Sequence, residues 1–398
     1  MSTIISEITQ QVTPDVHLVR DVSTVLSELD ADLYSLDTLT RRMKPGPPAT
    51  QVKIEWEEDD ILPRTDTVTA DEAGGAAGAT TTPDVANGSM WRKDDIIYTP
   101  DIPTNPAFLI ESISTNTLTI RALGIRSGAN PTGFGTVPAL PAGTVLAWLG
   151  NARYEGFTTL VGRTTMPEQD FNLCELFDST IYVTKTREAT KNYTMNDWLR
   201  ARRKQLAEFR KDIEGKLWFN ERSETKDATS QELRWTMRGV TRFLTKQLTY
   251  DKDIVGAPRI TESQVMDWLA DVFGGNNGSS SRFLFADTYL ATELSKIMLT
   301  SLRSRRIEKV VGVKVEVLEF SFGEVYIKHQ RFFNLVGKNH YGVILDMENI
   351  YKRELRPMER TILDLKKGQG TDKDAEQYLE QCSLEVRNKA THAEIIGN

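Results

Sequence analysis

The sequence contains few cysteines and histidines and no long apolar stretch. Only Cys174 and Cys382 are present among 398 residues, so a disulfide-rich scaffold is excluded and a reducing compartment is favoured. The four histidines lack the spacing of a metal-binding pair, and neither cysteine is part of a CxxC motif. No apolar run reaches the roughly 18 residues of a membrane span, and the N-terminus does not resemble a signal peptide. We therefore predict no metal site, no cofactor and no membrane association.

Common catalytic motifs are also missing. Residues 274–281 are rich in glycine and serine, but this run has no Gly-Lys-Ser/Thr ending and follows a predicted helix. A phosphate-binding loop has that ending and follows a strand, so a flexible connector is the better interpretation. No serine sits in a GxSxG elbow. These absences argue against an enzyme, although an active site built from residues far apart in sequence stays open as an alternative.

The acidic residues are concentrated near the N-terminus. The net charge is −7, and residues 1–60 contain twelve acidic and only five basic side chains. After Thr13-Pro14, which can start a helix, Val16 and Val19 begin a row of apolar residues at helical spacing. We predict that residues 1–50 form a largely helical, acidic arm. It packs either on a neighbouring surface or on its own domain.

Strand patterns follow the arm. Val52, Ile54 and Trp56 alternate with charged residues, which predicts a strand with one buried face. Residues 65–90 are rich in Thr, Ala and Gly and are predicted to form a long, mobile loop. Two apolar segments flank the turn at 114–117 and predict a hairpin. We expect a β-rich module inserted at 88–144.

The rest of the chain mixes helices and strands. A helix is predicted from Thr194 to about Arg222, with Phe209 in its apolar stripe and a basic opposite face that includes Arg200 and Arg203. Residues 223–330 are predicted to form a compact α/β unit, in which Thr261-Glu-Ser-Gln264 matches a capping box. The predicted fold class is α+β.

Two dense charge clusters lie in predicted exposed regions. Glu55, Glu57 and Glu58 precede two further aspartates, and Arg303, Arg305 and Arg306 form a basic patch. Carboxylates need a pocket that perturbs their pKa values before they act as catalysts, so we interpret the acidic cluster as solvated or as pairing between subunits. The basic patch has no interleaved aromatic residues. It fits an acidic partner subunit at least as well as nucleic acid. An arm, a long loop and an exposed helix together favour a self-assembling structural protein.

Several segments resemble the major capsid proteins of tailed bacteriophages with the Hong Kong 97-type fold. Ile54-Glu-Trp-Glu-Glu58 is similar to the strand entering the extended loop of that fold, and 151–156 is similar to its return. Residues 182–187 through 210–214 resemble the stretch along the spine helix, and Leu384-Glu-Val-Arg-Asn388 resembles the C-terminal strand. The resemblance covers the chain from about residue 50 onward. The closest similarity is to a subfamily with an inserted β-module.

The resemblance implies a division of the chain into capsid regions. These are an N-terminal arm (1–50), an extended-loop region (51–87 and 145–190), an inserted β-module (88–144), a peripheral domain with the spine helix (191–222 and 331–398) and an axial domain (223–330). It implies self-assembly into hexamers and pentamers of an icosahedral phage head around double-stranded DNA. The alternatives are an encapsulin-like cargo shell of the same fold, or an enzyme without a recognised motif.

Further expectations concern partners and contact residues. Decoration, scaffold and portal proteins are expected partners, DNA would be bound without sequence specificity, and the protein would be a virion component assembled in the host bacterial cytoplasm. The candidate assembly contacts are Val16, Val19, Glu55, Glu57, Glu58, Arg200, Arg203, Phe209, Arg303, Arg305 and Arg306.

Overall fold

The computed structural model shows a mixed α+β protein with two compact units, which confirms the predicted fold class. The first unit contains Met1–Glu58 and Gln169–Asn398, and the second contains Asp59–Glu168. The residues described are 35–43, 45–59, 61–126, 132–157, 162–190, 197–229, 231–254, 259–274, 278–300, 305–310, 313–363 and 373–398. Val16, Val19, Thr194 and Arg303 lie outside them.

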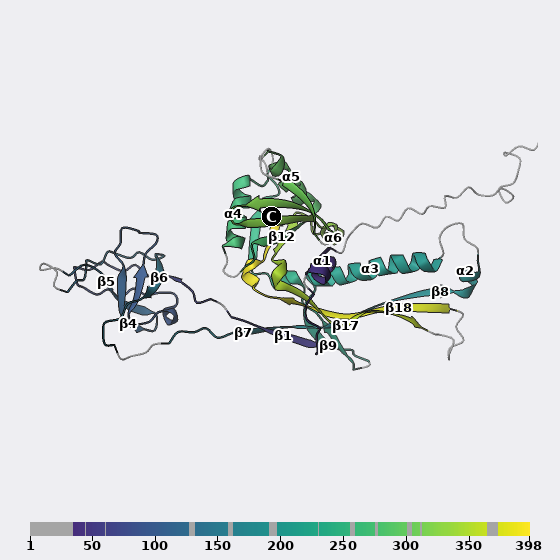
Figure 1. Ribbon diagram of the computed structural model, residues 1–398, viewed down its shortest axis with the longest axis horizontal. Coiled ribbons are helices and arrows are strands. Elements are labelled where there is room, and N and C mark those ends of the chain that lie inside the picture. Colours follow the sequence, from purple (N-terminus) through teal and green to yellow (C-terminus); the bar gives the residue numbers. More distant parts are fainter. Residues whose placement is uncertain are drawn as a thin grey trace, which may run out of the picture. The chain divides into compact units, whose positions relative to one another are not determined.

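A long helix lies along a three-stranded antiparallel sheet in the first unit (Figure 1). The helix is α3 (Asp197–Phe219), and the sheet has the order β17 (Ile350–Leu363), β18 (Lys373–Val386), β8 (Glu175–Thr184). Phe209, Ile213 and Leu217 follow one another at helical spacing and are fully buried, which explains why this face of α3 is against the sheet. The predicted apolar stripe is therefore correct.

The first unit also contains a seven-stranded mixed sheet. Its strands lie in the order β11 (Lys246–Tyr250), β19 (Ala393–Gly397), β16 (Tyr341–Leu345), β12 (Ser281–Ala286), β15 (Gly323–His329), β14 (Val313–Phe320) and β13 (Arg305–Val310). β12 pairs with β15 in parallel and with β16 antiparallel.

Both faces of this sheet are buried. On β12, Leu284 belongs to a core with helices α4 (Glu262–Phe273) and α5 (Thr288–Thr300), whereas Phe285 belongs to the core that contains α3. Successive strand residues point to opposite faces, so the apolar run in β12 supplies both cores. Trp218 of α3 packs edge-on against Phe285, with 5.1 Å between the ring centroids. The end of α3 is thus fixed to the sheet.

Local capping matches the sequence. Thr261 Oγ1 accepts a hydrogen bond from Gln264 N at 3.2 Å, so Thr261 is the N-cap of α4 as predicted. Asp287 Oδ1 accepts from Leu290 N at 2.8 Å at the start of α5. The remaining elements of this unit are α1 (Ser35–Met43), α2 (Lys185–Ala189), α6 (Arg331–Leu335), β1 (Lys53–Glu58) paired with β7 (Glu168–Leu173), and the hairpin of β9 (Ser223–Lys226) and β10 (Leu233–Thr236).

The second unit is built on a five-stranded sheet of its own. The strand order is β2 (Thr65–Thr67), β6 (Val145–Asn151), β3 (Asp95–Tyr98), β4 (Phe108–Ser114) and β5 (Thr117–Ala122). The predicted hairpin is β4–β5. Its turn contains Thr115 in the left-handed region at φ 55°.

Residues 65–90 differ from the loop that the sequence predicted. Val68 and Val85 are buried in the core of the second unit, and isolated bridges tie Thr81 to Ile120 and Asp84 to Thr117. The composition of the segment did not indicate that it packs within the second unit. Two valines and backbone hydrogen bonds attach it there, without large apolar residues.

The compact units and sheets combine segments from more than one predicted region. The second compact unit is wider than 88–144, because β2 and β6 complete its sheet. Strands β16 and β19 come from 331–398, yet both lie in the seven-stranded sheet with the strands of 223–330. Sheet pairing between distant segments is not visible in local patterns.

Leu217→Ala should destabilise the first unit by about 2–5 kcal/mol, since it leaves a cavity between α3 and the sheets. Lys204→Ala on the exposed side of the same helix should cost less than about 0.5 kcal/mol. Thermal unfolding followed by tryptophan fluorescence measures both. Equal effects would show that α3 is not packed as described.

Candidate assembly surfaces

The helix at the end of the N-terminal arm is held by a buried carboxylate. Glu214 of α3 is fully buried, and its oxygens accept hydrogen bonds from the backbone N–H groups of Leu36 (2.9 Å) and Asp37 (2.8 Å) in the first turn of α1. These amides have no partner within their own helix. The carboxyl oxygens of Glu214 on a neighbouring helix therefore cap α1, at the end where the helix dipole favours negative charge.

Two side chains complete the set of donors around Glu214. Trp218 Nε1 donates at 2.9 Å and Gln330 Nε2 at 2.6 Å, while Gln330 Oε1 accepts from Ser35 Oγ at 3.0 Å. Burial raises the pKa of Glu214 to about 7, and the N–H donors act in the opposite direction by stabilising its ionised form. The site joins α1, α3 and the start of α6.

A second buried cluster holds the other side of α1. Lys352 of β17 pairs with Asp37 and, at 2.8 Å, with Glu380 of β18, and all three side chains are almost fully buried. Arg41 donates to Asp37 Oδ1 at 2.8 Å and pairs with Glu380 at 2.5 Å. Burial alone would raise the pKa of Asp37, but the charges of Lys352 and Arg41 outweigh it and lower the pKa.

The four charges of this cluster balance one another. Buried ions are costly unless they are paired, so removal of one partner is far more damaging than the pairs are stabilising. α1 is consequently fixed to β17 and β18 as well as to α3.

After α1, Ala49 N donates to Glu354 O at 3.0 Å, so the chain continues beside β17. The position of α1 is thus set by buried polar contacts.

The predicted acidic cluster is divided by strand β1. Glu55 and Glu57 are exposed, and Glu55 pairs with Lys53. Glu58 instead accepts from Trp56 Nε1 at 3.0 Å and from Asn388 N at 3.2 Å. Glu55 and Glu57 therefore lie on the accessible side of β1, whereas Glu58 makes contacts within its own subunit.

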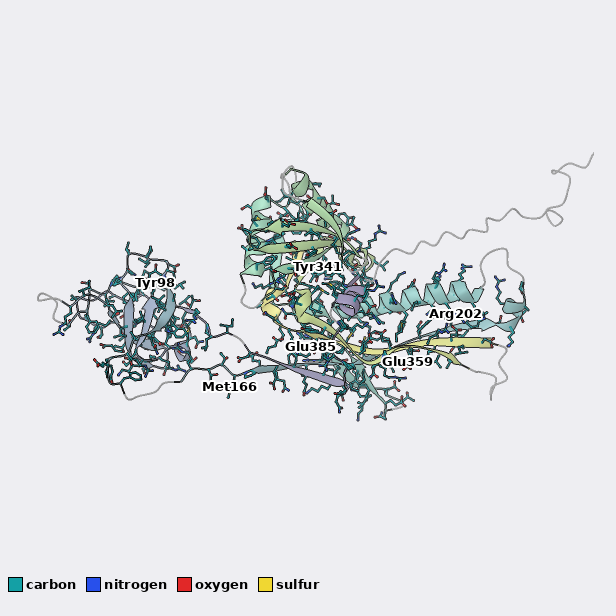
Figure 2. The ribbon with its side chains drawn as sticks, in the orientation of Figure 1. Tyr98, Met166, Arg202, Tyr341, Glu359 and Glu385 are labelled. Carbon is teal, nitrogen blue, oxygen red and sulfur yellow. The ribbon has the colours of Figure 1, made fainter. Side chains whose placement is uncertain are left out.

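The predicted basic residues are on α3 and β13. Arg200 and Arg203 are exposed on α3, and their neighbour Arg202 pairs with Glu376 of β18 through Nε at 2.7 Å (Figure 2). Arg305 and Arg306 lie on β13, opposite Leu318 and Val317 of β14. The structure does not bring the α3 arginines into one cluster with the acidic residues of β1.

Phe209 is buried inside the subunit. Its side chain is 1% exposed and lies 6.2 Å from the ring of Tyr378 on β18. The sequence could not show this, because an apolar stripe looks the same whether it packs within a subunit or between subunits. In the folded chain its ring is already covered.

Exposed apolar side chains are found in the segments at the ends of the second unit. Met166 is 87% exposed (Figure 2), and Ile61, Tyr154 and Phe157 are also exposed. In the same segments, Trp148 lies between two arginines, with Arg64 at 4.3 Å and Arg163 at 3.9 Å from its ring. These cation–π contacts hold the two segments together. Large apolar side chains that are exposed to solvent suit a contact surface.

Metal-binding groups and membrane-spanning helices were sought in the described residues. Within them no group of His, Cys, Asp and Glu side chains could hold a metal ion, and no described helix is long and apolar enough to cross a membrane.

A family comparison identifies the class of protein. The family model of the SU10 major capsid protein matches residues 4–398. The chain belongs to this family. It is a structural capsid protein of the phage type and not an enzyme, as the sequence resemblance implied. Its subunits assemble into the capsomers of a capsid, and the protein is a component of the virion.

Comparison with solved structures returns capsid and shell proteins. A chain of Mycobacterium phage Bobi is 9% identical, with a TM-score of 0.45 over 96% of this chain and 97% of that one. A capsid chain of a native GTA particle is 8% identical, with a TM-score of 0.44 over 99% and 100%. The SrpI encapsulin of Synechococcus elongatus PCC 7942 is 9% identical, with a TM-score of 0.40 over 58% and 77%. No curated protein matches the sequence.

The residues that hold α1 were not predicted as a site. Asp37 and Arg41 are separated by four positions, a helical ion-pair spacing that the sequence does show. Glu214, Lys352 and Glu380 gave no such signal, because each is an ordinary charged residue until the strands and helix are placed.

Glu214→Ala should release α1, because it leaves four N–H donors without their acceptor, each at a cost of about 1–3 kcal/mol. Trypsin should then cleave after Arg41 and Arg42 at least tenfold faster than in the wild type, measured by mass spectrometry of the peptides. Glu208→Ala, on the exposed side of α3, is the matched control and should leave the rate unchanged. An unchanged rate in Glu214→Ala would contradict the capping role.

Lys352→Met should destabilise the first unit by about 3–5 kcal/mol, since Arg41 alone then faces two buried carboxylates. Replacing Asp37 by Leu in the same chain should recover part of the loss. Denaturant unfolding of the two single variants and the double variant measures the coupling. Strict additivity would argue against the network.

Proposed function

We propose that this protein forms the hexamers and pentamers of an icosahedral phage head that encloses double-stranded DNA. The observation that carries the proposal is the group of exposed apolar residues, with Met166 the most exposed of them, on the segments at the ends of the second unit. A single chain leaves these side chains in water, and a neighbouring copy would bury them. Family membership supports the same conclusion.

The proposed regions follow the observed elements. The second unit would supply the extended loop and the inserted module, α3 with β17, β18 and β8 the peripheral domain, and the seven-stranded sheet the axial domain. Residues 1–34 would be the arm that contacts another subunit, starting from the anchored helix α1. Many modest contacts of this kind add up in a closed shell.

Charge suggests which surfaces meet which partners. Arg200, Arg203 and Lys204 are exposed on α3 and would contact DNA phosphates without reading sequence. Glu55 and Glu57, exposed on β1, would pair with basic residues of a neighbouring subunit. Arg305 and Arg306 are candidates for the basic side of such a contact. Decoration, scaffold and portal proteins are further proposed partners, and assembly would take place in the cytoplasm of a bacterial host.

Electron microscopy of the protein expressed alone, with size-exclusion chromatography, tests the proposal. Closed particles or capsomer rings are expected. A monomer that stays monomeric even with its phage's other head proteins present would contradict self-assembly.

Deletion of residues 1–34 should leave a folded subunit that no longer forms closed shells, because α1 and its partners are retained while the arm is lost. Circular dichroism checks the fold, and negative-stain microscopy counts the shells. Shells as abundant as those of the full chain would exclude an assembly role for the arm.

Met166→Asp should reduce assembly at least tenfold without changing the melting temperature, since this side chain makes little contact within its own subunit. Light scattering during assembly provides the measurement. Lys226→Asp, at an exposed position of β9, is the matched control and should assemble at the wild-type rate. Assembly of Met166→Asp at the wild-type rate would remove this residue from the contact surface.

A further inference from the structure

Two short connectors join the three-stranded sheet to the seven-stranded sheet. Residues 346–349 lead from β16 to β17, and residues 387–392 lead from β18 to β19. Arg387 N donates to Asn349 O at 2.9 Å, so the connectors touch directly. Glu385, at the end of β18, pairs with Arg353 and Arg387 (Figure 2). Because these strands run from one sheet into the other, a change in the angle between the sheets must strain this junction.

A buried histidine links the two connectors through both of its ring nitrogens. His392 is fully buried; its Nδ1 accepts from Asp346 N at 3.0 Å, and its Nε2 lies 3.0 Å from Arg387 O. Since Nδ1 is an acceptor, the proton of the neutral ring is on Nε2 and is donated to the carbonyl. Only the neutral tautomer satisfies both contacts. A protonated ring would direct an N–H group at the N–H group of Asp346.

The charged groups nearest His392 come from strand β12 and from the two connectors. Asp346 carries a carboxylate that pairs with the buried Arg282 of β12 at 3.1 Å. The same carboxylate accepts from Ser279 N at 3.0 Å and Asn349 Nδ2 at 2.9 Å. The other charged residues on the connectors are Glu348, Arg387 and Lys389. The charge of Asp346 favours an imidazolium and the charge of Arg282 opposes it, but burial of the ring is the largest effect and lowers the pKa of His392.

We propose that His392 is an acid-sensitive link between the two connectors. Its neutral ring holds them together through two hydrogen bonds, and its protonation opens the junction between the sheets. In a shell, such an opening would let the two sheets of one subunit change their relative orientation. The inference goes beyond the proposed function. It concerns the single chain, so it can be tested whether or not shells form.

The direction of the pH effect follows from the burial of the ring. Burial lowers the pKa of His392 to about 4, whereas an exposed histidine titrates near 6.5. The contribution of His392 to the closed junction is therefore complete above about pH 6.5 and decreases as the pH falls toward 4. Between pH 7.5 and pH 5, the opening equilibrium should increase about thirtyfold. Global melting would mix this effect with that of Glu214, whose raised pKa acts in the opposite sense, so the readout must be local.

Hydrogen exchange of the full-length, unassembled chain tests the proposal. After correction for intrinsic rates, protection of peptides covering 346–349 and 387–392 should fall about thirtyfold from pH 7.5 to pH 5. Protection of β14 and β8 should not change. Constant protection at the connectors would overturn the proposal, and so would an equal loss in β14 and β8, because that would be general unfolding.

Two histidine variants distinguish the effect of His392 protonation from that of other titratable groups. His392→Gln cannot titrate at this position, so the protection of its connectors, corrected for intrinsic exchange rates, should not change between pH 7.5 and pH 5. His329→Gln, at the end of β15, should keep the wild-type pH dependence. A His392→Gln chain that keeps the thirtyfold change, or a His329→Gln chain that loses it, would contradict the assignment. If His392→Gln does not fold, the wild-type profile with its two reference strands still decides.

Discussion

The contact between Glu214 and the first turn of α1 constrains the rest of the first unit. A nine-residue helix is too short to be stable alone in water, so α1 exists because other elements hold it. Glu214 caps its first amides, and Lys352, Asp37, Arg41 and Glu380 neutralise one another on its other side. These polar contacts are buried, directional and costly to break. They fix α1 to α3, β17 and β18.

A capsid subunit must combine a fixed core with surfaces that adapt to unequal neighbours. Here the fixed part is α3, held between the two sheets by Phe209, Leu217 and Trp218. For the adaptable part we propose the exposed side chains of the second unit, such as Met166, which is 87% exposed. A buried charge without a counter-charge and an apolar side chain exposed to water both raise the free energy of the protein. Each therefore indicates a group that should pack against it. For the charges, that partner is in the same chain; for the apolar residues we propose another copy.

Local features of the fold could be predicted from the sequence, and distant pairings could not. The hairpin β4–β5 and the Thr261 cap follow from residues within a few positions of one another. Asp37 and Lys352, in contrast, are 315 positions apart, and nothing in either segment indicates the other. Val68 and Val85 looked like loop residues, but they bridge each other, and backbone hydrogen bonds to Thr144 and Asn116 join them to distant segments. The predicted interface residues Glu58 and Phe209 illustrate the same difficulty. Both have side chains that could contact a second subunit, but in the folded chain Glu58 is hydrogen-bonded to Trp56 and Asn388, and Phe209 packs near Tyr378.

The most direct test is a cryo-electron microscopy map of the assembled shell at side-chain resolution. The account predicts that, in every non-equivalent subunit, α1 lies on its own α3 with Glu214 against the amides of Leu36 and Asp37. The arm before it and the second unit would differ from one position to another. A shell in which α1 is detached, or is docked on the α3 of a neighbour, would contradict the account.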